Sequence, residues 1–72
     1  MASASRSPHL APIRHSAAIA VGQSIELSGP MLASLRFREI NVSEAFTLVD
    51  ADGTFFRASR KTDTQALVYE QL

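Results

Sequence analysis

The sequence predicts an α+β fold, in which a small antiparallel β-sheet of four to five strands packs against one short C-terminal α-helix. Three observations lead to this fold class. A polar insert ending in Asp-Gly separates two runs rich in β-branched and aromatic residues, apolar residues alternate on both sides of Gly22, and the pattern from Thr62 to Gln65 is typical of a helix start. The 72 residues form one domain at most, and we expect a disordered N-terminal arm over residues 1–15 and a folded domain over residues 16–72.

The predicted arm contains mainly alanine, serine, proline and arginine, with Leu10 and Ile13 as its larger apolar residues after the initiator. Pro8 and Pro12 disfavour regular structure, so we expect this segment to be disordered. It contains no acidic residue, a feature that is also typical of organellar transit peptides. The sequence therefore leaves open whether the arm is a targeting segment.

Residues 16–28 predict a first hairpin, because Gly22-Gln23 fits a two-residue connection of type II′. Apolar residues alternate with small or polar residues on both sides of this pair: Ile19, Val21, Ile25 and Leu27. The high alanine content of residues 16–21 leaves a helix there as the alternative.

Residues 31–40 fit two structures. A helix would have Ser28 as its N-cap and Pro30 near its first position. A strand would explain an alternation of apolar and basic side chains in the second half of the segment: Leu35, Arg36, Phe37 and Arg38. Helical spacing places Phe37 on a different side from the leucines, so we favour a strand over residues 35–40 and keep the helix open.

The strongest local pattern is the hairpin over residues 45–59. Asp50 and Asp52 can bond their own backbone in the turn, and Gly53 can adopt a positive φ without a Cβ clash. On each strand one set of alternate residues is apolar: Phe46, Leu48, Phe56 and Ala58. This pattern predicts a sheet with one covered face and one mixed face.

The predicted cover is a C-terminal helix. Thr62 and Gln65 have the spacing of a capping box. In this motif the Thr62 hydroxyl accepts from the Gln65 backbone N–H, and the Gln65 side chain accepts from the Thr62 backbone N–H. Leu67, Val68 and Leu72 then fall on one helical stripe, which must dock because so short a helix is unstable alone. A strand is the alternative for this segment.

Composition excludes several classes of protein. The chain has no cysteine, so disulfides and thiolate metal sites are excluded, and this composition fits a cytoplasmic location. Seven basic and seven acidic residues balance, which argues against strong nucleic-acid binding, and no apolar run approaches the ~20 residues of a membrane span. A chain this short buries only about 60% of its unfolded surface, so self-association would help its stability.

Three short motifs are better explained as turns or chance matches than as functional sites. Residues 50–53 match the middle of a calcium-binding EF-hand loop, but Ser59 stands where the loop needs a bidentate glutamate. Residues 41–43 match a glycosylation acceptor in a chain without a secretory signal. His15-Ser16 suggests a nucleophile, but no third group is placed to activate it. We expect no catalytic, cofactor or metal site.

The remaining candidates are basic and aromatic side chains. If residues 35–40 and 54–59 lie in one sheet, several of these side chains project from its mixed face: Arg36, Arg38, Phe55 and Arg57. Arg60 and Lys61 add charge nearby, and Tyr69 would stand at the rim of the C-terminal helix. Aromatic residues and arginine are enriched at the centres of protein interfaces.

We therefore predict a non-enzymatic protein–protein binding module, either a homodimer or an inhibitor or adaptor like many small bacterial proteins. It would act through the mixed face and edges of the sheet. The alternative is a weak nucleic-acid-binding protein that uses the sheet-face arginines, because small RNA-binding sheets combine phosphate contacts with base stacking. The sequence identifies neither a partner nor the oligomeric state.

Overall fold

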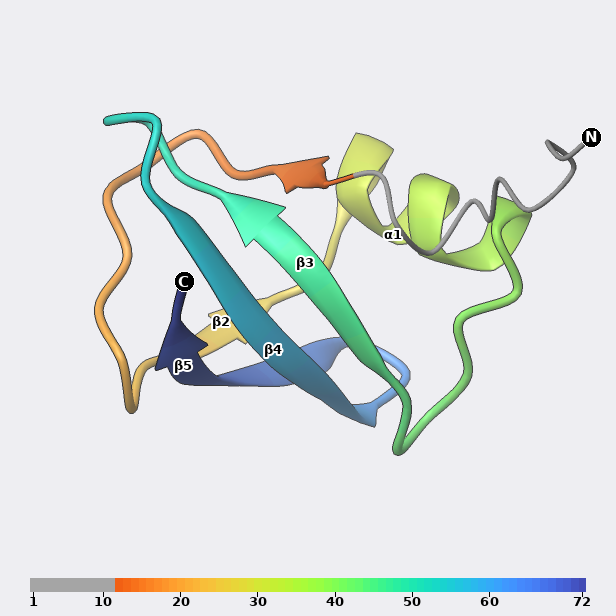
Figure 1. Cartoon of the computed structure of the whole chain (residues 1–72). Helices are drawn as coiled ribbons and strands as arrows, with labels where there is room; N and C mark the ends of the chain where they lie inside the picture. Colours follow the sequence, from red (N-terminus) through yellow and green to blue (C-terminus); the bar gives the residue numbers. More distant parts are fainter. Residues whose placement is uncertain (1–11) are drawn as a thin grey trace, which may run out of the picture.

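A computed structural model describes residues 12–72, which fold into one five-stranded sheet and one helix (Figure 1). The chain runs through β1 (Ile13–Arg14), β2 (Ser24–Glu26), α1 (Gly29–Phe37), β3 (Ala45–Val49), β4 (Phe55–Thr62) and β5 (Gln65–Gln71). The strand order across the sheet is β1-β3-β4-β5-β2. The α+β class is therefore correct in its elements, but their order along the chain differs from the prediction.

The sheet is mixed and strongly curled, where an antiparallel sheet was predicted. β1 runs parallel to β3, with Ile13 opposite Leu48, and the other neighbouring strands are antiparallel. The folded part thus includes Ile13 and Arg14, which the predicted boundary at residue 15 assigned to the arm. Residues 1–11, the rest of that arm, lie outside the described residues.

The central hairpin formed by β3 and β4 is confirmed. Phe46 and Leu48 are buried on one strand, as are Phe56 and Ala58 on the other. At the turn, Asp50 accepts hydrogen bonds from its own neighbours and Gly53 has a φ of 83°, as predicted. Side chains from all five strands, from α1 and from the connecting loops meet on the inner face of the curled sheet. They form one core: Ile13, Ile19, Ile25, Leu27, Leu35, Ile40, Phe46, Leu48, Phe56, Ala58, Ala66 and Val68.

The predicted first hairpin is wrong in its first half. Residues 16–21 contain neither a strand nor a helix, and β2 pairs with β5 instead. The reason is that the backbone of this segment bonds to the β3–β4 turn: Ile19 N–H donates to Asp50 Oδ2 at 3.1 Å, and Ala51 N–H donates to the Ala17 carbonyl at 3.3 Å.

Residues 29–37 form α1, so the strand favoured over residues 35–40 is wrong and the helical alternative is correct. Ser28 is the N-cap, with extended backbone dihedral angles but no capping bond from its side chain, and Pro30 lies in the first turn. The helix ends in a Schellman motif, in which Ile40 N–H donates to the Leu35 carbonyl and Glu39 N–H donates to the Arg36 carbonyl.

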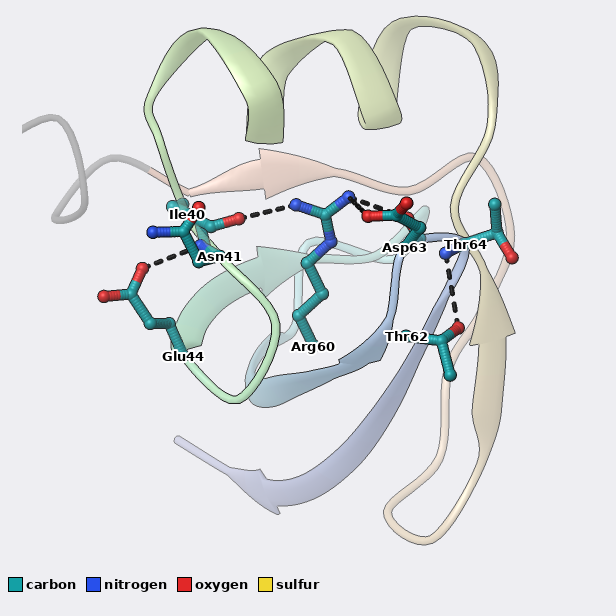
Figure 2. A network of polar contacts seen from close by, with 7 residues as sticks. All are labelled: Ile40, Asn41, Glu44, Arg60, Thr62, Asp63 and Thr64. Carbon is teal, nitrogen blue, oxygen red and sulfur yellow. Dashed lines mark hydrogen bonds and ion pairs between the residues drawn. The ribbon is translucent and has the colours of Figure 1, made fainter.

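The predicted C-terminal helix is also wrong, because residues 65–71 form strand β5 beside β4. Ala66 and Val68 point into the core with the two-residue period of a strand. The supposed capping box is the hairpin turn, where Thr64 N–H donates to the Thr62 hydroxyl at 3.3 Å (Figure 2). The helix that covers the inner face is α1, which lies next to β1 (Figure 1).

Candidate functional site

The outer face of the sheet carries three of the five residues predicted to bind a partner. Phe55 and Arg57 occupy alternate exposed positions on β4. Arg57 pairs with Glu70 of β5, and the next pair is Ala58 with Val68. Tyr69 is therefore an additional, bulged residue, and it is exposed next to Arg57 and Glu70. Phe55 and Tyr69 are 43% and 45% exposed. Aromatic and basic side chains therefore share this open face, although Tyr69 comes from a strand rather than from a helix.

The other two predicted binding residues lie elsewhere. Arg36 is in the last turn of α1, and Arg38 is the C-cap residue of the same helix. Because Leu35 enters the core, α1 covers the inner side of the sheet, opposite the face that carries Arg57. The prediction that Arg36, Arg38 and Arg57 share one sheet face is wrong, since the segment that carries the first two is helical.

The helical end also exposes a residue that the prediction did not include in a site. Phe37 is 88% exposed, the largest value among the large apolar side chains of residues 12–72, and it stands between Arg36 and Arg38. The sequence contains a signal for this exposure, because helical spacing places Phe37 on a different side from Leu35. The alternation of Leu35 and Phe37 with Arg36 and Arg38 is the competing signal, and it favours a strand.

A shallow groove of about 290 Å³ runs between β1 and the side of α1. Its basic side chains are Arg14, which is exposed on β1, and Arg38. Its remaining lining is apolar or weakly polar: Pro12, Ile13, Pro30, Met31 and Ser34. Arg38 is partly buried and has an interaction partner of its own. We call this hollow the β1–α1 groove.

A second hollow of about 240 Å³ shares Arg14, Pro30 and Met31 with the β1–α1 groove, so the two adjoin. Its other lining residues are polar: His15, Ser16, Glu26 and Ser28. We call it the His15 groove. The sequence offered no basis for combining Arg14 with α1, because Arg14 was assigned to the disordered arm.

Two buried charged residues outside these grooves have structural roles. Asp50 accepts three backbone N–H bonds, from Ile19, Asp52 and Thr54 at 2.9 to 3.1 Å. Burial alone would raise the pKa of this carboxyl, but the three N–H donors and the nearby His15 outweigh it, so the pKa lies below its ordinary value. Because both of its carboxylate oxygens accept backbone hydrogen bonds, Asp50 stabilises the turn, as the interpretation of residues 50–53 as a turn predicts.

Arg60, which was expected to add charge near the binding face, is 4% exposed and lies beneath α1 (Figure 2). Its Nη1 donates to the Ile40 carbonyl at 2.7 Å, and its Nη2 donates to the Asp63 carbonyl at 2.8 Å. The guanidinium thus joins the loop after α1 to the β4–β5 turn, and it does not reach a ligand at the surface.

Among residues 12–72, no three histidine, aspartate or glutamate side chains gather in a way that would hold a metal ion. Within the same residues, no helix has the length and apolar character needed to cross a bilayer. Comparisons with protein-family models, curated proteins and solved structures find no match to this chain.

Proposed function

We propose that this chain is a non-enzymatic protein that binds single-stranded nucleic acid weakly. The binding surface would be formed by β1 and the end of α1. The observation that carries the proposal is the position of Phe37, which is 88% exposed between Arg36 and Arg38, next in sequence to a residue of the β1–α1 groove. We define the helix-end surface as Arg14, Arg36, Phe37 and Arg38.

Each part of the helix-end surface matches a requirement of single-strand binding. A base can stack on an exposed aromatic ring, and such stacking is worth about 1–3 kcal/mol per base. Exposed Arg14 and Arg36 supply the positive charge that phosphates require, and the β1–α1 groove gives the backbone a path past Arg14. The proposed ligand is a single strand because bases in a duplex are not free to stack on Phe37.

The charge balance predicts weak affinity. Basic and acidic residues are equal in number over the whole chain, and Glu39 follows directly after the helix-end surface. Binding must therefore depend on a local cluster of arginines and on stacking rather than on the net charge of the molecule. A small number of phosphate contacts also predicts a shallow dependence of the affinity on salt.

The test is fluorescence anisotropy with a labelled oligouridine and a labelled oligothymidine of about ten nucleotides, each titrated with the full chain. Phe37→Ala should weaken binding by about fivefold to a hundredfold, the equivalent of one lost stack. Arg36→Ala should weaken binding and lower the salt slope by about one, the value for one phosphate contact.

The matched control is Phe55→Ala, which removes an exposed phenylalanine from the opposite face of the molecule. This variant should bind the oligonucleotides as the parent chain does. Equal losses in Phe37→Ala and Phe55→Ala, or no binding by the parent chain at low salt, would contradict the proposal.

A second candidate function is protein–protein binding through the outer face of the sheet. It is supported by the position of Phe55, Arg57 and Tyr69 on adjacent strands, with both aromatic rings nearly half exposed. The partner would be a second copy of the chain, or another cytoplasmic protein for which the chain serves as an inhibitor or adaptor. Light scattering over a dilution series tests self-association: Phe55→Ala should shift a dimer to monomer, while Phe37→Ala should not.

A further inference from the structure

The His15 groove adjoins the proposed nucleic-acid surface and contains an imidazole side chain. Arg14 lines both hollows, so a strand that follows the β1–α1 groove reaches the His15 groove directly. Two hydroxyl groups that can donate to a phosphate oxygen, those of Ser16 and Ser28, line the His15 groove as well. The Ser28 hydroxyl makes no capping bond to α1.

We propose that the His15 groove is a phosphate subsite whose affinity depends on the protonation of His15. This inference rests on the proposed nucleic-acid function, because the phosphate belongs to the strand bound at the helix-end surface. The ligand class is a phosphate group of a single-stranded nucleic acid, and binding takes up a proton on the His15 ring.

The charges that line the groove explain why the proton matters. Arg14 and Glu26 carry opposite charges, so a neutral His15 leaves the lining without net charge. Protonation of His15 adds one positive charge to the lining, which favours the phosphate relative to the neutral ring. The α1 residues in this lining, Pro30 and Met31, are uncharged and do not alter the balance.

A further charged group outside the lining interacts with His15. Asp50, which follows β3, is close enough for the two charges to interact, and its carboxylate is fixed by three backbone N–H bonds. The titratable and charged groups around the ring are therefore Arg14 at the end of β1, Glu26 on β2 and Asp50 after β3.

The ring has a backbone partner in either protonation state, because an unprotonated Nδ1 accepts from the Ala17 N–H and a protonated Nδ1 donates to the Ala17 carbonyl. Its Nδ1 lies 3.1 Å from the Ala17 carbonyl oxygen and 3.2 Å from the Ala17 nitrogen. A protonated His15 donates through Nδ1 to that carbonyl, and its Nε2–H remains as a donor for a phosphate oxygen. Because protonation favours the phosphate, the bound phosphate by the same linkage favours protonation.

The experiment measures the dissociation constant of the labelled oligouridine at about pH 5.5 and about pH 7.5, on either side of the usual histidine pKa. The parent chain should bind about two- to fivefold more tightly at the lower pH, the size expected for one exposed charge contact. His15→Gln should bind with the same affinity at both pH values. His9→Gln is the matched control, since His9 is the only other histidine, and it should keep the pH dependence of the parent chain.

If His15→Gln folds poorly, calorimetric titration of the parent chain tests the proposal without this variant. Titrations of the parent chain near pH 6.5 in two buffers with different heats of ionisation should show proton uptake on binding. Binding without proton uptake, or a pH dependence that survives in His15→Gln, would overturn the subsite while leaving the proposed function intact. An absence of oligonucleotide binding at both pH values would overturn both.

Discussion

Arg60 supports the fold through a buried polar side chain. It lies beneath α1 and donates to two backbone carbonyls, while its Nε has no hydrogen-bond partner (Figure 2). Its ion pair with Asp63 is long, at 3.4 Å, and the Asp63 side chain is 78% exposed. The backbone bonds should therefore contribute more to stability than the ion pair.

Arg60→Met keeps an apolar stem of similar length but removes both backbone hydrogen bonds, and it should lower the free energy of unfolding by about 2 kcal/mol. Asp63→Asn removes only the exposed charge and should cost less than about 0.5 kcal/mol. Urea denaturation measures both values. A loss in Asp63→Asn as large as that in Arg60→Met would show that the ion pair dominates.

Asp50 makes stability depend on pH, and the sign follows from its lowered pKa. The folded-state pKa lies below the ordinary value of 3.8, so the ionised carboxyl stabilises the fold above this value, and that stabilisation is lost as the pH falls through the folded-state pKa. Asp50→Asn should lower Tm at neutral pH, and the gap to the parent chain should close below about pH 3.8.

Melting curves recorded by circular dichroism from about pH 7 to about pH 2 check this expectation. Asp52→Asn is the control, because the Asp52 side chain is in the same turn and forms no bond to Ile19 or Thr54. It should retain the pH profile of the parent chain. A gap that persists unchanged at the acid end would contradict the role given to the Asp50 carboxylate.

At the scale of elements, the end of α1 contains backbone strain. Glu39 occupies the position after the C-cap with a φ of 59°, in the left-handed region that favours glycine. Leu35 and Ile40, whose backbones form the longer bond of the Schellman motif, are both buried, and this packing holds the chain in the strained conformation. The residue itself is exposed, so it can be changed without disturbing the core.

Glu39→Gly should raise the free energy of unfolding by about 0.5–1 kcal/mol, because glycine adopts this φ without a Cβ clash. Glu39→Ala removes the same side chain but keeps the Cβ, and it should leave stability nearly unchanged. Thermal and urea denaturation of the two variants distinguish relief of strain from loss of charge. Equal stabilisation in both variants would assign the effect to the charge.

Two of the wrongly predicted segments, residues 29–37 and residues 65–71, were misjudged for related reasons. Residues 29–37 lack the usual end signal of a helix, since glutamate stands where glycine normally does, and the alternation of Leu35 with Phe37 suggested a strand. Residues 65–71 follow directly on the pattern of Thr62 and Gln65, which occurs both in capping boxes and in hairpin turns. In both segments local spacing is ambiguous, and contacts with the rest of the chain decide the structure: α1 buries Leu35 in the core, and β5 pairs with β4 and β2. The β3–β4 hairpin was predictable because its turn chemistry is local.

At the scale of the whole molecule, the sheet depends on a pairing between the start of the described chain and its middle. β1 has only two residues, yet it supplies Ile13 to the core and covers one edge of β3. No local pattern indicates a parallel pairing across so long a separation, which is why Arg14 was absent from the predicted site. The helix-end surface could not be predicted without it.

A chain that starts at Ser16, the predicted boundary of the folded domain, should be less stable than one that starts at Pro12. The shorter chain loses Ile13 from the core and exposes the edge of β3, at an expected cost of about 2–4 kcal/mol in the free energy of unfolding. Urea denaturation of the two chains compares them directly. Equal stability would mean that β1 contributes nothing to the fold.

The brevity of β1 has a consequence for the timing of ligand binding. Two paired residues, the buried Ile13 side chain and the bond from His15 N–H to the Val49 carbonyl hold this strand, so its detachment costs less than opening the longer β3–β4 hairpin. Both grooves lose a wall whenever β1 detaches. The proposed binding surface thus has its own opening equilibrium, and a bound nucleic-acid strand should slow hydrogen exchange at the His15 amide while leaving the amides of β4 unchanged.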